Sequence, residues 1–409
     1  MTTDLRELRE AEWDGWFDKV DLAFGGVPEP PEGRALWRER TEIERSFGAR
    51  SDGDWVGTAG AFSFGLTVPG GGRVAAAGVT MVTVQPTHRR RGVLRSMMRH
   101  QLADVRARGE SLAVLTASEP AIYGRFGYGP ATQELRLGID TLRLAPPDLP
   151  GIDGVHLRLV DAAEALPACE RVYEQLVPTR PGMLARQPGW ERMGVYDPES
   201  EREGAGKLQC VVAEVDGVVR GYARYAVAPE WDHSGPCGAV RVRQIDALEP
   251  VVYAALWRYL FGMDLTSWVS ARGRPVDDPL LHLVADMRRC GIEARESLFV
   301  RPVEVGEALA ARTYLTPVDV VLEVADPFCP WNEGRWRLSG DAKGASCART
   351  TDAPDLALSV RELGSAYLGG FTLTSLAAAG RVQELRPGAL QAASVAFGSD
   401  AVPWLPHGF

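Results

Sequence analysis

The segment from Val82 to Leu94 joins a predicted strand to a predicted helix through a short basic loop. It reads Val-Thr-Val-Gln-Pro-Thr-His-Arg-Arg-Arg-Gly-Val-Leu, so a β-branched run ends at a proline and three arginines precede Gly92. Apolar residues at helical spacing over Arg91–Arg108 predict the helix. The first N–H groups of a helix lack intrahelical partners, and the helix dipole adds partial positive charge there. A basic turn alone would suit solvent equally, but the flanking strand and helix favour an anion site, and a diphosphate fits it.

The order of predicted elements around this loop indicates an α+β or mixed α/β fold. A strand-like pattern over residues 44–84 leads into the helix, and a short strand follows at Leu112–Thr116. Residues 4–23 have the apolar spacing of a helix. A comparable order recurs, without sequence similarity, after the proline-rich stretch 145–150, which we expect to be a linker. Its elements are expected to be the hairpin Gln209–Val215 and Val218–Val227, the strand Val240–Ala247, the helix Pro250–Phe261 and the strand Leu265–Val269.

A third region begins near Arg301 and again mixes strands with helices. We expect strands at Val318–Val324, Glu333–Leu338 and Leu356–Val360, and helices over Arg361–Tyr367 and Leu385–Phe397. The last nine residues, Ala401–Phe409, are mostly apolar, so we expect the C-terminus to be docked on the protein.

Composition argues against several classes of function. The net charge of −9 argues against a nucleic-acid partner, which would favour a basic face. The six cysteines are scattered without a CxxC pair, and no set of histidines, cysteines or carboxylates has metal-ligand spacing. We therefore expect neither a disulfide framework nor a metal. The N-terminus lacks an apolar signal segment and no apolar run could span a bilayer, so a cytoplasmic protein without membrane contact is expected.

A second cluster, from Ala117 to Ala131, interleaves three glycines with three aromatic residues. Glycine at this density permits tight turns and the close approach of a ligand. A tyrosine hydroxyl has a reference pKa of about 10, so at neutral pH it can donate a proton to a leaving group. We take Tyr123 as the candidate acid and expect Tyr128 to pack in the core. The alternative is that both rings pack against a helix and the glycines serve only the turns.

The first segment resembles the phosphate loop of the GCN5-related N-acetyltransferase superfamily, Arg/Gln-x-x-Gly-x-Gly/Ala. Arg89 and Gly92 match its first and fourth positions, while Leu94 stands where a small residue is usual. The resemblance implies acetyl-CoA as co-substrate, with its pantetheine arm paired to the strand backbone. The residues that it implies for acetyl-CoA binding are Val82, Val84, Arg89, Arg90, Gly92, Val93, Leu94 and Ser118.

The second cluster resembles the enhanced intracellular survival (Eis) branch of that superfamily, which carries Ile-Tyr-Gly-Arg-Phe-Gly-Tyr-Gly-Pro-Ala nearly residue for residue. The resemblance covers essentially the whole chain. It implies an active acetyltransferase domain over residues 1–147, a degenerate copy over 148–298 and a sterol-carrier-like domain over 299–409. It also implies that Tyr123 is the general acid and that the α-carboxylate of Phe409 is the base. From the residues alone, that carboxylate would be an ordinary solvated anion.

The Eis resemblance further implies a homo-hexameric enzyme that acetylates amines of a cationic small molecule, such as an aminoglycoside or another polyamine. Candidate substrate-binding residues are Asp21, Phe24 and Trp37, although the residue type of Phe24 and Trp37 favours a place in the core. Gly408 stands before the final residue where some aminoglycoside-modifying members have an acidic one. The alternatives are a protein lysine acetyltransferase and a non-catalytic protein that binds lipid or acyl ligands through its third domain.

Two other candidate sites have structural interpretations. His88 stands beside three arginines that disfavour its charged form, so we expect it to cap or pack. Asp277 and Asp278 precede Pro279 and are expected to cap a helix, rather than to form a catalytic carboxylate pair.

Overall fold

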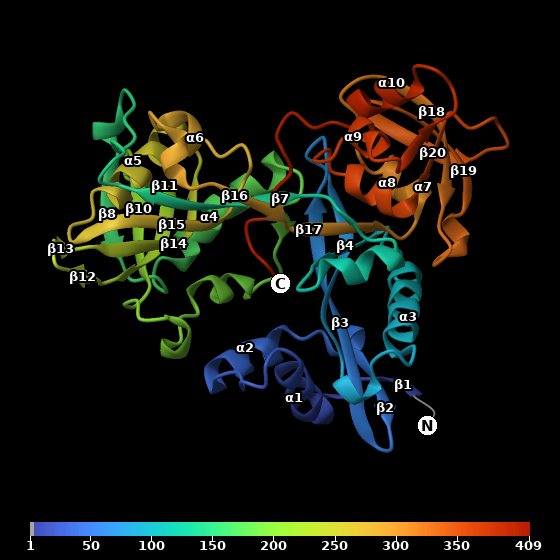
Figure 1. Ribbon diagram of the computed structural model, residues 1–409, viewed down its shortest axis with the longest axis horizontal. Helices are drawn as coiled ribbons and strands as arrows, with labels where there is room; N and C mark the ends of the chain where they lie inside the picture. The colour runs from blue at the N-terminus through green and yellow to red at the C-terminus, as the bar shows by residue number, and fades with distance from the viewer. Residues whose placement is uncertain (1–3) are drawn as a thin grey trace. The chain divides into compact units, whose positions relative to one another are not determined.

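The computed structural model describes residues 4–409 and divides the chain into two compact units (Figure 1). Of the described residues, the first unit contains residues 4–132, 297–403 and 408–409. The second contains residues 133–296 and 404–407. The proline-rich stretch 145–150 lies inside the second unit, and the chain passes between the units on either side of residues 133–296.

The first unit contains a mixed sheet with the spatial order β1-β2-β3-β4-β5-β17-β6. Neighbouring strands are antiparallel except β4 and β5, which run parallel. The strands are β1 (Asp4–Glu7), β2 (Phe47–Ser51), β3 (Asp54–Thr67), β4 (Arg73–Val84), β5 (Leu112–Thr116), β17 (Leu298–Pro302) and β6 (Gly129–Pro130). The predicted strand at Leu112–Thr116 is confirmed at both ends.

Helices α1 (Trp13–Ala23) and α3 (Val93–Ala107) cover opposite faces of this sheet. Leu102 of α3 belongs to the same core cluster as Ala61 of β3. Trp16 of α1 lies against Gly60, which directly precedes Ala61 in β3. Because successive residues of a strand point to opposite faces, the two helices must lie on different sides.

Two predicted helix starts in this unit are wrong. Residues 4–7 form the edge strand β1, and Glu10–Glu12 form a 3-10 turn before α1. Backbone pairing with β2 outweighs the weak apolar spacing of these residues. The helix predicted from Arg91 begins at Val93, because Gly92 has a φ of +85° and ends the loop in a left-handed conformation.

The second unit contains a sheet with the order β16-β7-β15-β14-β11-β10-β8. Its strands are β16 (Glu293–Glu296), β7 (Gln133–Asp140), β15 (Thr266–Arg274), β14 (Gly238–Ala247), β11 (Val218–Ala228), β10 (Gln209–Val215) and β8 (His156–Val160). The short strands β9 (Leu184–Ala185), β12 (Trp231–Asp232) and β13 (Gly235–Pro236) are also in this unit. Its helices are α4 (Leu166–Leu176), α5 (Pro250–Phe261) and α6 (Leu280–Leu283).

The two larger helices of this unit also cover opposite faces. Val211 of β10 packs in the cluster that contains Leu256 of α5, and the next residue, Val212, packs in the cluster that contains Cys169 of α4. The predicted β10–β11 hairpin and the helix Pro250–Phe261 are confirmed. The repeat of topology is therefore real, with a helix between two parallel strands in each sheet.

Residues 303–403 complete the first unit and fold around a sheet of order β20-β19-β18-β21-β22. Its strands are β18 (Val318–Ala325), β19 (Gly334–Asp341), β20 (Gly344–Arg349), β21 (Leu356–Ser359) and β22 (Val382–Glu384). Its helices are α7 (Val305–Ala310), α8 (Val360–Ala366), α9 (Leu373–Ala378) and α10 (Ala389–Ala396). The helix predicted from Leu385 begins only at Ala389, because Pro387 and the left-handed Gly388 precede it.

Candidate active site

Strand β4 separates from β5 partway along its length. The parallel pairing covers Ala76–Gly78 of β4 and Leu112–Val114 of β5, whereas β4 continues to Val84. Gln85 donates its N–H to the carbonyl of Val56 in β3 at 2.9 Å. By strand alternation, the N–H and C=O of Val84 face the edge that β5 has left. An open strand edge of this kind can pair with an extended ligand.

The basic loop leads from this open edge to α3. No side chain caps the first turn of the helix, and that turn contains no acidic residue. Arg89, Arg90 and Arg91 are exposed, and within residues 4–409 none of their guanidinium groups pairs with a carboxylate. The Nε of Arg89 lies 3.4 Å from the carbonyl oxygen of Val84. The loop therefore offers uncapped N–H groups and three positive charges to an anion.

The residues that follow Gly92 are set into the core below the loop. Val93 is buried, and Leu94 is half-buried against core residues of the sheet and α3. The larger side chain at position 94 is thus accommodated by packing. His88 makes a local contact, with its Nδ1 2.9 Å from the hydroxyl of Thr87.

Tyr123 lies in a 3-10 turn, Pro120–Phe126, that follows β5. Its half-buried ring packs edge-on against Tyr128, with the ring centroids 5.9 Å apart. Its hydroxyl forms no hydrogen bond with any residue that the structure describes. Burial, with a smaller effect of the charge of Glu119, raises the pKa of Tyr123 above its ordinary value of 10.0. A neutral phenol without a partner has the chemistry of a proton donor.

Three glycines let this turn pack closely against α8. A Cβ on Gly127 would lie 2.8 Å from Cγ1 of Val360, and φ of Gly127 is +87°. A Cβ on Gly129 would overlap the carbonyl oxygen of Arg361. A Cβ on Gly124 would lie 2.9 Å from the guanidinium carbon of the same arginine. These glycines therefore serve the contact with the third region of the chain, as well as the turn itself. Tyr128 is fully buried, as expected.

The ring of Phe409 packs where β4 and β5 separate. Its centroid is 5.1 Å from that of Phe64 in β3, with the ring planes at 62°. A Cβ on Gly78 would lie 2.5 Å from the ring of Phe64 and 3.1 Å from Cε2 of Phe409. Gly78 is the last residue of β4 that pairs with β5. The absent side chain of Gly78 thus makes room for the rings of both Phe64 and Phe409 beside the open edge.

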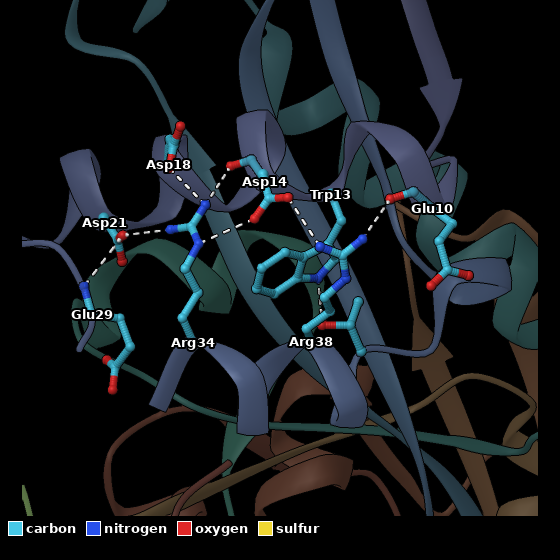
Figure 2. Close-up of polar contacts among 9 residues, drawn as sticks. Glu10, Trp13, Asp14, Asp18, Asp21, Glu29, Arg34 and Arg38 are labelled. Atoms are coloured by element: carbon cyan, nitrogen blue, oxygen red, sulfur yellow. Dashed lines mark hydrogen bonds and ion pairs between the residues drawn. The ribbon is translucent and has the colours of Figure 1, made fainter. Parts of the chain in front are cut away.

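Figure 2 shows how one arginine of α2 (Pro31–Arg40) reaches three aspartates of α1. Arg34 contacts Asp14 at 3.2 Å, Asp18 at 2.8 Å and Asp21 at 3.3 Å. Burial opposes the charge of Arg34, but hydrogen bonds to Asp18 and Asp14 outweigh it and raise the pKa of the guanidinium. Asp21 also accepts the backbone N–H of Glu29. A cationic ligand at Asp21 would therefore share that carboxylate with Arg34.

The other residues predicted to bind the substrate or the donor differ in how exposed they are to solvent. Phe24, just after α1, is 62% exposed, so the favoured assignment of its ring to the core is wrong. Trp37 is half-buried on α2, and Ser118 is exposed just after β5.

The second unit has filled the equivalent opening in its own sheet. Pairing of β14 with β15 ends at Val242 and Ala271. Beyond that point Arg274 donates to the carbonyl of Ile245 at 3.1 Å and pairs with the buried Asp278 at 2.8 Å. In addition, Glu249 and Pro250 stand at the start of α5, where a carboxylate opposes an anionic ligand. In both respects the second sheet differs from the sheet of the first unit.

The expectation that Asp277 and Asp278 cap a helix is only partly right. Asp278 accepts the N–H of Leu280 at 2.9 Å, but its carboxylate also binds Arg274. Asp277 instead pairs with Arg180 at 2.8 Å.

Residues 4–409 contain neither a metal-binding cluster nor a membrane-spanning helix. No group of three or more histidine, cysteine or carboxylate side chains is arranged to hold a metal ion. None of the described helices is long and apolar enough to cross a bilayer.

The sequence matches known protein families along most of its length. Residues 4–131 and 182–302 each match a family described as an acetyltransferase (GNAT) domain, and residues 305–406 match a sterol carrier protein domain. A Streptomyces avermitilis protein described as an uncharacterized N-acetyltransferase is 61% identical over 409 residues, which are the whole of both chains. N-acetyltransferase Eis of Mycobacterium tuberculosis is 34% identical and covers 98% of each chain. The crystal structure of Eis1 from Mycobacterium abscessus is 36% identical, with a TM-score of 0.85 over both whole chains.

The fold and these matches define a GCN5-related N-acetyltransferase, an enzyme whose co-substrate is acetyl-CoA. Within that superfamily, the chain belongs to the Eis branch. The predicted fold class is confirmed: tandem acetyltransferase domains are followed by a sterol-carrier-like domain.

Three residues that contact Phe409 or the turn of Tyr123 have little or no signal in the sequence. Phe64 has no local signal, because its partner Phe409 is at the far end of the sequence. Gly78 has a weak signal, since an isolated glycine inside a strand pattern marks the close approach of another group. Arg361 looks like any exposed helix residue until its contact with the tyrosine turn is seen.

Proposed function

We propose that this enzyme transfers the acetyl group of acetyl-CoA to an amine of a cationic small molecule, of the aminoglycoside or polyamine class. Tyr123 is the general acid, and the α-carboxylate of Phe409 is the base. The observation that carries the proposal is the course of β4. It leaves β5 after Gly78 and opens a strand edge that has the ring of Phe409 at one end and the basic loop at the other.

The donor is held along this edge. The pyrophosphate lies on the uncapped start of α3, where charge-assisted bonds from the loop arginines neutralise it. The pantetheine arm adds to β4 as an extra strand would. The residues that we assign to donor binding are Val82, Val84, Arg89, Arg90, Gly92, Val93, Leu94 and Ser118.

In the reaction, the amine nitrogen bonds to the thioester carbonyl carbon. The amine gives a proton to the carboxylate of Phe409, directly or through a water. Backbone N–H groups of the open edge near Val84 stabilise the oxyanion. The C–S bond then breaks, its electron pair stays on sulfur, and the hydroxyl of Tyr123 protonates the thiolate to give CoA. Solvent carries the proton from the carboxyl group back to Tyr123.

The acceptor lies on the side of α1 and α2. Asp21 attracts the cation, and the exposed ring of Phe24 and the half-buried ring of Trp37 form walls. A protein lysine acetyltransferase would share the chemistry, so only the choice of acceptor distinguishes the two. Binding of lipid by the third domain has less support. A cavity of about 530 Å³ there is lined by charged residues, including Glu323 and Arg381, as well as by apolar ones such as Leu358.

A thiol-release assay with acetyl-CoA tests the function. The panel contains aminoglycosides, linear polyamines and a lysine peptide. Release with small cationic amines and not with the peptide is expected. The absence of release with every amine would contradict the proposed function, and preference for the peptide would favour the lysine alternative.

Two variants test the assigned roles. Tyr123→Phe removes the acid and should lower kcat by about 10²–10⁴-fold. Tyr128→Phe is the matched control and should keep the rate. A residue added after Phe409 moves the carboxylate and should also abolish turnover. Full activity of Tyr123→Phe would exclude it as the acid, and full activity of the extended chain would exclude the terminal base.

The remaining assignments follow from the same family resemblance. We propose functional domains over residues 1–147, 148–298 and 299–409, and a homo-hexamer that acts in the cytoplasm. Light scattering of the purified protein tests the sixfold mass, and a dimeric or monomeric mass would contradict it.

A further inference from the structure

Strand β4 contains a bulge within its open portion. Thr80 pairs with Gly60 of β3, and Thr83 pairs with Thr58. Two residues of β4, Met81 and Val82, therefore face the single residue Ala59. A bulge adds one residue to a strand, and it changes which side of the strand each following residue faces.

In this bulge, Met81 adopts an unfavourable backbone conformation. Its φ is +52°, in the left-handed region that glycine enters freely. A non-glycine residue there costs about 1–2 kcal/mol. The conformation is maintained only if neighbouring groups favour it over regular strand.

A buried hydroxyl of β3 supplies that support. Thr58 is 0% exposed, and its Oγ1 lies 2.7 Å from the carbonyl oxygen of Met81 and 2.7 Å from Oγ1 of Thr83. A carbonyl can only accept, so the Thr58 hydroxyl donates to Met81. The Thr83 hydroxyl must then donate to Thr58. This relay of two buried hydroxyls ends on the strained residue.

The position of the bulge connects it to the reaction. It lies between Gly78, where β5 departs, and Val84, whose N–H faces the open edge. If β4 were regular through Met81 and Val82, the residues after them would slip by one position. The N–H of Val84 would then face β3 instead of the open edge.

We infer that Thr58 is a positioning residue for acetyl transfer, which holds the Met81–Val82 bulge so that the N–H groups of β4 face the thioester oxygen. The inference rests on the proposed function in one respect, the use of this edge as the thioester site. It adds a residue from β3 that touches neither donor nor acceptor.

The test uses the full-length enzyme and four variants. Thr58→Val removes the hydroxyl with little change of shape, and Thr58→Ser keeps it. Met81→Gly relieves the strain, alone and combined with Thr58→Val. The measurements are kcat and KM with acetyl-CoA and an accepted amine, the Kd of CoA, and Tm. CoA lacks the thioester carbonyl, so its affinity reports the loop and strand contacts without the oxyanion.

Thr58→Val should lower kcat by about 10- to 100-fold, less than the loss of a whole oxyanion donor. The Kd of CoA should stay unchanged, and Thr58→Ser should keep most of kcat. Met81→Gly should restore kcat in the Thr58→Val background, because glycine needs no support at positive φ. Thr58→Ala provides the same test if the valine variant does not fold.

Two results would overturn the inference. One is an unchanged kcat in Thr58→Val. The other is a parallel loss of kcat, CoA affinity and Tm that Met81→Gly does not restore, which would make Thr58 an ordinary core residue. A wild-type enzyme that is inactive with every amine would contradict the proposed function instead, so the two failures are distinguishable.

Discussion

The guanidinium of Arg301 and the carboxylate of Asp326 form an ion pair at 2.8 Å, with side chains 0% and 1% exposed. Arg301 comes from β17 of the acetyltransferase sheet, and Asp326 follows β18 of the sterol-carrier-like domain. The Nε of Arg301 also donates to the carbonyl of Phe126 at 3.2 Å, at the end of the turn that carries Tyr123. Arg301 thus connects the turn of the candidate acid, through Phe126, with both sheets of the first unit.

Breaking this pair should destabilise the first unit strongly. Arg301→Leu leaves Asp326 charged and buried, which costs about 3–5 kcal/mol. Denaturant unfolding measures the change. The control is Arg337→Leu, whose ion pairs with Asp319 and Asp352 are about half exposed and should contribute less than about 1 kcal/mol. Equal losses in the two variants would contradict this account of the buried pair.

A methyl group on Gly127 should displace the tyrosine turn from α8. Gly127→Ala adds strain at a φ of +87° and a clash with Val360. Gly109→Ala is the matched control, since Gly109 has a φ of +76° but open space around it. The control should lose about 1–2 kcal/mol of stability from strain alone. Gly127→Ala should lose more and should also lower kcat. Similar behaviour of both variants in unfolding and in turnover would show that the contact with α8 is unimportant.

The pH dependence of turnover follows from the burial of Tyr123. Burial raises its pKa above 10.0, so the phenol stays protonated through neutral and mildly alkaline solution. With saturating acetyl-CoA, kcat should therefore not fall as pH rises to about 10. The folded state holds this proton more tightly than the unfolded chain, so its contribution to stability is lost above that range. A descending limb centred at about pH 8 would contradict Tyr123 as the acid.

Acid should weaken the sterol-carrier-like domain through Asp355. A hydrogen bond from Arg386 lowers the pKa of Asp355 below 3.8, burial opposes it, and the N–H of Val321 adds a second bond. Because the folded pKa is the lower one, the stabilisation is complete above the unfolded value of 3.8 and is lost as pH falls through the folded value.

Asp355→Asn should therefore lower the free energy of unfolding at pH 7 by about 1.5–3 kcal/mol and flatten its decline below pH 4. Urea unfolding at several pH values measures this. Asp54→Asn, which changes an exposed carboxylate at the first residue of β3, is the control and should follow the wild type. An unchanged acid limb in Asp355→Asn would contradict the assignment.

The sequence predicted those helices and strands whose ends are defined by neighbouring residues in the chain. The strand Leu112–Thr116 and the helix Pro250–Phe261 were predicted to the residue, because apolar runs and a proline define their ends. The start of α3 was missed by two residues, since the left-handed conformation of Gly92 is invisible to periodicity. Residues 4–7 became a strand because of a partner, β2, that lies far along the sequence.

The candidate site was predicted only where its residues are contiguous. The basic loop and the tyrosine turn are continuous segments with their own chemistry, so the residues themselves indicated a function. The contact of Phe409 with Phe64, the support of Met81 by Thr58 and the packing of Arg361 on Gly124 all join distant segments. Such contacts depend on the pairing of strands and domains, which no local pattern encodes.

Arg274 also bears on how the two halves of this chain can evolve. Reopening the second sheet by losing Arg274 would leave Asp278, whose side chain is 0% exposed, as an unpaired buried charge, at a cost of about 3–5 kcal/mol. Losing Asp278 first would instead leave Arg274 as the unpaired buried charge. No single substitution at this pair returns the copy to an open sheet without a large loss of stability. Selection for folding alone is thus enough to keep this pair, and with it the closed part of the second sheet.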